Sequence, residues 1–136
     1  MEQRISFVTL AVRDLDASRR FYLDGLGWGA DLEVPDDVVM IRAGEHLVLS
    51  LWNREHFEAE IGEPAGTGLP PFTLSHNVRT EAEVDQILET ARAAGATVGE
   101  AIEREWGGYT GYFADPDGFR WEIATNPGPI GQVVLP

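Results

Sequence analysis

The sequence predicts an α+β protein made of two tandem β-α-β-β-β units, and an internal repeat is the main reason. A segment that opens as a strand and runs through a helix to a glycine occurs twice. Val12 and Gly29 of the first copy stand 66 positions before Val78 and Gly95 of the second. A repeat that fills half the chain implies two copies of one structural unit. Two such units most naturally come together around a shared cleft, and we expect the functional site there.

Length and composition are typical of one globular domain without a membrane segment. The chain has 136 residues, 43% of them hydrophobic, and no cysteine. It lacks an apolar run of the ~20 residues that a membrane helix needs, and its first residues do not form a secretory leader. The absence of cysteine excludes disulfides, thiolate catalysis and cysteine-bound metals. We therefore expect a soluble, cytoplasmic protein.

The charge is strongly acidic, with 23 acidic residues against 10 basic ones, all arginine, and a formal net charge of −13. Such a field repels nucleic acid and anionic membranes and attracts cations. We expect neither a nucleic-acid nor a membrane partner. The charge has two interpretations: solubility alone, or a preference for a cationic ligand.

The first unit is expected at about residues 4–52. A strand over residues 5–12 is rich in β-branched and apolar residues, and Asp14 can cap the helix that begins at Leu15. Gly25, Gly27 and Gly29 end that helix. Three further strands are expected over residues 28–34, 38–42 and 46–52.

A connector at residues 53–71 precedes the second unit, with a short helix expected over residues 55–61. The second unit, at residues 72–126, opens with a strand over residues 72–78. Thr80 and Glu83 then match a capping box, and apolar side chains at helical spacing lead to Gly95. Further strands are expected over residues 97–102, 109–114 and 120–125, followed by a Gly/Pro-rich tail at residues 127–136.

Two sequence motifs, together with the repeat, resemble those of the vicinal oxygen chelate superfamily. One is Asp-Leu-x-x-Ser-x-x-Phe-Tyr, which ends at Phe21-Tyr22, and the other runs from Tyr112 through Asp-Pro-Asp-Gly to Glu122. This superfamily includes glyoxalase I, extradiol dioxygenases, methylmalonyl-CoA epimerase, and the fosfomycin- and bleomycin-resistance proteins. The resemblance covers nearly the whole chain. It implies a half-open barrel, with a glyoxalase/bleomycin resistance-like fold, that is often completed in a homodimer.

In metal-dependent members of that superfamily, histidines on the opening strands and glutamates on the closing strands hold the ion. By position, the resemblance maps these ligands to Phe7, Ser50, Thr73 and Glu122. Only Glu122 can serve as a strong ligand, because a phenyl ring has no lone pair and zinc needs three or four donors. We therefore predict no metal and no other cofactor.

Glu122 is the candidate catalytic residue, because strand alternation directs it inward, where it can transfer protons or pair with a basic ligand. Aromatic and hydroxyl side chains are expected to form the walls of the same cleft and to favour planar or cationic ligands. The candidate ligand-binding residues are Phe7, Ser50, Trp52, Thr73, Trp106, Tyr109, Tyr112 and Phe113.

Three functions remain open at this point. The first is a metal-free binder of a small organic ligand, cationic or aromatic, similar to the bleomycin-resistance proteins. The second is a metal-dependent lyase, isomerase or dioxygenase whose ligands include unmapped residues such as His46 or His56. The third is a metal-free enzyme that uses Glu122 as acid or base.

Overall fold

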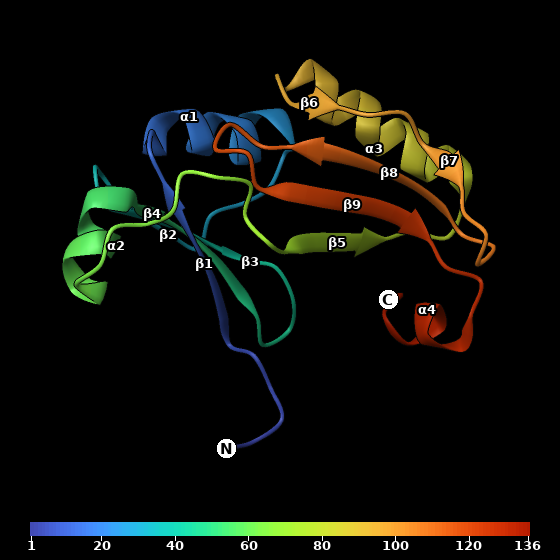
Figure 1. Cartoon of the computed structure of the whole chain (residues 1–136), viewed down its shortest axis with the longest axis horizontal. Helices are drawn as coiled ribbons and strands as arrows, with labels where there is room; N and C mark the ends of the chain where they lie inside the picture. Colours follow the sequence, from blue (N-terminus) through green and yellow to red (C-terminus); the bar gives the residue numbers. More distant parts are fainter. The chain divides into compact units, whose positions relative to one another are not determined.

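The computed structural model describes all residues from Met1 to Pro136, and they form two compact units, Met1–Thr67 and Gly68–Pro136 (Figure 1). Each unit contains one mixed sheet with helices, so the α+β class and the two β-α-β-β-β units are confirmed. No helix combines the length and the hydropathy that crossing a membrane would require.

The first unit contains a four-stranded sheet in the order β1-β4-β3-β2. Its strands are β1 (Phe7–Val12), β2 (Leu32–Val34), β3 (Val38–Arg42) and β4 (Val48–Asn53). β1 and β4 pair in parallel, whereas β3 pairs antiparallel with both of its neighbours. Opening and closing strands of the unit therefore lie side by side.

The core of the first unit lies on one face of this sheet, under α1 (Leu15–Arg19) and the π-helical segment η1 (Arg20–Gly25). As predicted, Asp14 caps α1, and its carboxylate accepts from the Ala17 amide at 2.8 Å. Phe21 and Tyr22 are buried edge to face. The strands bury the apolar side chains of Leu10, Val12, Val39, Ile41, Leu49 and Leu51.

The predicted strand over residues 28–34 is shorter in the structure and begins only at Leu32. Trp28 packs back on the preceding helical segment instead. Its amide donates to the Tyr22 carbonyl at 3.1 Å, and its ring lies 5.8 Å from that of Tyr22. Packing of the half-buried indole against the helix thus overrides its strand propensity.

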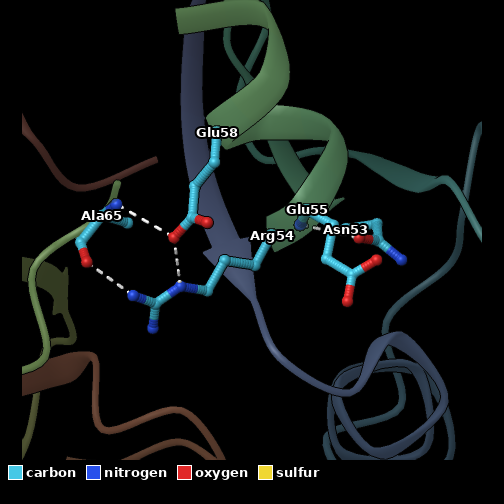
Figure 2. A network of polar contacts seen from close by, with 5 residues as sticks. All are labelled: Asn53, Arg54, Glu55, Glu58 and Ala65. Carbon is cyan, nitrogen blue, oxygen red and sulfur yellow. Dashed lines mark hydrogen bonds and ion pairs between the residues drawn. The ribbon is translucent and has the colours of Figure 1, made fainter. Parts of the chain in front are cut away.

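The expected connector helix is present as α2 (Arg54–Ile61), capped by Asn53. Figure 2 shows how α2 fixes the segment after it. Glu58 Oε1 accepts from Arg54 Nε at 2.7 Å and from the Ala65 amide at 2.9 Å, while Arg54 Nη2 donates to the Ala65 carbonyl at 2.5 Å. These bonds lower the pKa of Glu58, mainly through the Arg54 guanidinium.

The second unit repeats the same plan, with sheet order β5-β9-β8-β6 and β7 also pairing with β8. Its elements are β5 (Thr73–Asn77), α3 (Glu81–Ala93), β6 (Thr97–Val98), β7 (Ile102–Glu103), β8 (Tyr109–Ala114), β9 (Arg120–Thr125) and α4 (Pro129–Val133). β5 and β9 pair in parallel. The predicted strand over residues 97–102 is split into β6 and β7, because residues 99–101 lie outside both strands and Ala101 packs toward Gly111.

Helix α3 covers one face of the second sheet (Figure 1). The predicted capping box of Thr80 and Glu83 is present, with both side chains bonded to the other's backbone amide. Val84, Leu88 and Ala91 are buried against the sheet. Gly111 lets α3 approach β8 closely, since a Cβ there would lie 2.3 Å from Leu88 Cδ1.

We predict that Gly111→Ala lowers the free energy of unfolding by about 1–3 kcal/mol, because the added methyl group overpacks the contact between helix and sheet. Urea unfolding followed by circular dichroism measures the change. The matched control is Gly68→Ala, where a Cβ meets nothing within 4 Å. Equal stability of the two variants would contradict this account of the packing.

Candidate functional site

A group of polar side chains lies on the face of the second sheet opposite α3. Strand alternation and the register of β5, β9 and β8 place them together, with β9 in the middle (Figure 1). We call this surface the Glu122 face. Its residues are Thr73, Ser75, Thr110, Tyr112, Arg120 and Glu122.

Glu122 is held by two hydroxyl groups from the neighbouring strands. The Tyr112 hydroxyl donates to Glu122 Oε1 at 2.6 Å, and the Ser75 hydroxyl donates to Oε2 at 3.0 Å. Both donors are register partners of Glu122, one on each side of β9. The carboxylate is therefore fixed in orientation and keeps further lone pairs for a ligand.

Tyr112 is affected by the same contact. Its hydrogen bond to the Glu122 carboxylate, with partial burial and the negative charge, raises the pKa of the phenol. The neighbouring Arg104 guanidinium opposes this shift. Tyr112 thus stays protonated at neutral pH and acts as a donor to Glu122.

Arg104 adds a positive charge beside this pair. It follows β7, in a tight turn in which its amide donates to the Gly108 carbonyl at 2.7 Å. Its Nε donates to the buried Thr110 hydroxyl at 2.5 Å, and its guanidinium carbon lies 6.0 Å from the centre of the Tyr112 ring. The half-buried guanidinium is thus anchored at one end, with its Nη groups left for another partner.

Other predicted residues of the second unit are placed differently. Thr73 lies on the Glu122 face but is exposed, opposite Arg120. Trp106 is 55% exposed, and its ring lies against Gly108. Both therefore stand at the margin of the Glu122 face or in the loop beside it.

The expectation that Tyr109 and Phe113 line a cleft with Glu122 is corrected. Both project from β8 to the side of α3, as strand alternation from Tyr112 requires. The Tyr109 hydroxyl donates to Asp85 of α3 at 2.9 Å, and the buried Phe113 ring stacks on Trp121 at 6.1 Å. The alternation along this strand could have been read from the sequence. The prediction instead followed the general enrichment of aromatic residues.

In the first unit, Phe7, Ser50 and Trp52 share one face of the sheet. Phe7 pairs with Val48 and Ser50 with Thr9, so these side chains alternate with the buried core positions. Phe7 is exposed, Ser50 is buried and Trp52 is half-buried.

Trp52 belongs to a polar cluster at the end of that face. Asp37 Oδ1 accepts from Trp52 Nε1 at 2.9 Å and lies 2.7 Å from His56 Nδ1. The hydrogen bond with His56, and then that with Trp52, lowers the pKa of Asp37. His56 therefore already has Asp37 as its hydrogen-bond partner. His46 lies in an exposed turn beside Glu45.

The residues at the positions that hold metal in the resembling family do not fit a metal ion. The first unit offers Phe7 and Ser50, and the second offers Thr73 and Glu122, whose two oxygens already accept from hydroxyl groups. No group of three or more His, Asp or Glu side chains is arranged to hold a metal. Zinc needs three or four such donors.

Sequence reasoning missed Ser75, Arg104 and Arg120 as members of the site. Ser75 and Arg120 could have been found, because they are two positions from Thr73 and Glu122 and so share their strand faces. Arg104 gave no such signal, since it lies in a turn outside the periodic strands.

A separate cavity of about 390 Å³ lies in the second unit, between the start of α3 and the C-terminal segment. Its lining includes Arg79, Asn126 and Leu135, and Arg79 donates there to the Pro136 carbonyl. The cavity contains none of the predicted site residues.

We predict that Glu122→Gln lowers the pKa of Tyr112 toward its ordinary value, because the negative charge that opposes phenolate formation is removed. Titration of the tyrosine ring carbons by NMR measures the shift. Tyr109 is the internal control, since its raised pKa depends chiefly on Asp85. If the pKa of Tyr109 moved and that of Tyr112 did not, the proposed pairing would be refuted.

A second prediction concerns Asp37, whose pKa is lower in the folded chain than the ordinary value of about 3.9 in the unfolded chain. Its ionised form therefore stabilises the fold above that value, and the contribution is lost as the pH falls through the lower folded pKa. Asp37→Asn should unfold at lower temperature than the parent at pH 7, with the difference disappearing in acid. The control is Asp36→Asn, since the positive φ of 61° at Asp36 suits asparagine equally well.

Comparisons with known proteins agree with this fold. A glyoxalase-related enzyme from Fulvimarina pelagi is 36% identical, with a TM-score of 0.86 over 93% of this chain and 90% of that one. A hypothetical protein from S. aureus is 28% identical, with a TM-score of 0.78 over 93% and 95% of the two chains. A lactoylglutathione lyase from Agrobacterium tumefaciens, 24% identical over 92% and 95%, with a TM-score of 0.73, supports the fold alone.

Among proteins of curated function, none matches the chain. The family model described as Glyoxalase/Bleomycin resistance protein/Dioxygenase superfamily matches residues 4–123. This match confirms the resemblance inferred from the repeat and the two motifs. The chain belongs to the glyoxalase/bleomycin resistance protein/dioxygenase superfamily.

Proposed function

We propose that this protein binds a small organic molecule on the Glu122 face and that binding requires no metal ion. The observation that carries the proposal is the Glu122 carboxylate, which hydroxyl groups from two neighbouring strands hold in one orientation. A half-buried, oriented acceptor on a rigid sheet is the kind of polar group that gives a small-molecule site its specificity. A ligand hydroxyl or N–H can donate to the lone pairs that Tyr112 and Ser75 leave free.

The chemistry of the side chains supports metal independence. Phe7 supplies no lone pair where the family's pattern expects a ligand, and Thr73 and Ser50 supply only neutral hydroxyl oxygens. Glu122 is satisfied by neutral donors and needs no cation to balance a bare carboxylate. The metal-dependent alternative would need ligands such as His46 or His56, and neither lies in a group of three or more potential ligands.

A metal-free lyase or isomerase is a second candidate, and the contact between Tyr112 and Glu122 favours it. Glu122 could accept a proton from a bound carbonyl compound while Tyr112, kept protonated by its raised pKa, holds the carboxylate in place. The relative from Fulvimarina pelagi is described as an enzyme. Turnover that disappears in Glu122→Gln while binding persists would distinguish this function from sequestration.

The proposal is tested by screening a library of anionic, neutral and cationic fragments with ¹H–¹⁵N NMR in excess EDTA. We expect ligands that shift the amides of Ser75, Tyr112 and Glu122. Glu122→Gln should lower the affinity for these ligands at least about tenfold, because a hydrogen bond to a charged group contributes about 1.5–3 kcal/mol.

The matched control is Glu100→Gln, an exposed glutamate outside the Glu122 face. It should leave these affinities unchanged. Binding that EDTA abolishes, or ligands that shift only amides of the first unit, would refute metal-independent binding on the Glu122 face.

A further inference from the structure

We propose that the ligand of the Glu122 face is a small organic carboxylate that also carries a hydroxyl or N–H group, with Arg104 and Arg120 binding its negative charge. This inference rests on the proposed function and specifies its ligand class. It differs from the cationic ligand that was one of the two interpretations of the net charge.

The first step is the absence of ion-pair partners for two half-buried arginines. Five of the other eight arginines lie in ion pairs with neighbouring carboxylates: Arg4, Arg19, Arg42, Arg54 and Arg92. Within the second unit, no carboxylate lies within the 4.0 Å ion-pair distance of Arg104 or Arg120. With 23 acidic residues against 10 arginines, partners are plentiful. A guanidinium that is partly removed from water and lacks an anion is suited to bind one from a ligand.

The second step is that Glu122 does not neutralise these two charges. Its oxygens accept from Tyr112 and Ser75, and neither guanidinium is its partner. The two guanidinium groups and the one carboxylate described here thus carry two positive charges against one negative charge, although the net charge of the chain is −13. For a ligand in contact with this face, the nearby charged side chains contribute more to the electrostatic energy than the distant charges of the chain, which salt screens over about 10 Å.

The third step is the arrangement along the strands. Glu122 pairs with Tyr112, while Arg120 lies on the same face two residues away, about 7 Å along β9. Arg104 lies on the other side of this pair, anchored to Thr110, which is the partner of Ala124. Arg120 and Arg104 therefore lie on opposite sides of Glu122 along β9.

This order of charges defines the ligand chemistry. A carboxylate fits a guanidinium through charge-assisted, often bidentate hydrogen bonds. A hydroxyl or N–H group a few bonds away can donate to Glu122 at the same time. A cationic ligand would gain one attraction to Glu122 and meet two repulsions from the arginines.

The test uses four probes that share one ring: cis-3-hydroxycyclohexanecarboxylate, its carboxamide, 3-(aminomethyl)cyclohexanol, and cyclohexanecarboxylate. Calorimetric and NMR titrations measure each affinity. We expect the hydroxy acid to bind about tenfold more tightly than its amide, and the amine most weakly. Cyclohexanecarboxylate, which cannot donate to Glu122, should bind more weakly than the hydroxy acid.

Arg104→Gln and Arg120→Gln should each lower the affinity for the hydroxy acid about tenfold. The affinity for the amide should stay unchanged. Arg104→Lys, which keeps the charge but loses the fork of donors, should fall between the parent and Arg104→Gln. The control is Arg92→Gln, which removes an exposed arginine of α3 that pairs with Glu89. Circular dichroism of each variant checks that it is folded.

Failure of this inference is distinguishable from failure of the proposed function. If the probes shift Glu122-face amides but the amide or the amine binds as tightly as the acid, the ligand class is wrong and the site stands. If the affinity for the hydroxy acid is unchanged in both Arg104→Gln and Arg120→Gln, the ligand class is also wrong. If none of the four probes reaches the Glu122 face, the result counts against both proposals.

Discussion

In each unit the opening strand pairs in parallel with the closing strand, and the candidate site depends on this pairing. In the second unit the register sets Ser75 opposite Glu122, and the antiparallel neighbour sets Tyr112 on the other side. Three residues far apart in the chain thus become one hydrogen-bonded group on a single sheet face. A shift of one residue would turn Ser75 to the side of α3 and leave the carboxylate without that donor.

The Glu122 face differs from the metal site that superfamily membership implies. A single carboxylate persists, while the other implied positions hold a phenyl ring and two hydroxyl groups. The hydroxyl groups of Tyr112 and Ser75 orient the Glu122 carboxylate. Membership in a superfamily does not specify a chemistry, so the side chains present on the face are the better guide to its ligand.

Much of the fold could be predicted because local signals agreed with the tertiary structure. Strands 38–42, 109–114 and 120–125 match β3, β8 and β9, and the Thr80–Glu83 capping box is present. The errors occur where tertiary packing prevailed. Trp28 leaves its predicted strand to pack on Tyr22, and residues 99–101 lie between two short strands instead of in one. Local propensity carries no information about such long-range contacts.

The sequence by itself determined the class of fold, the repeat and the family, because periodicity, caps and motifs are local properties of the chain. It also identified Glu122 as a candidate site residue. Only the tertiary structure decided which groups surround Glu122. Strand register selects Ser75 over Thr73 as its donor, and the strand face separates Tyr112 from Tyr109 and Phe113. The turn after β7 brings Arg104 to Tyr112. Net charge was compatible with solubility alone or with a cationic ligand, whereas the local geometry supports the proposed anionic one, because electrostatic recognition depends on the charges within a few ångströms rather than on their sum over the chain.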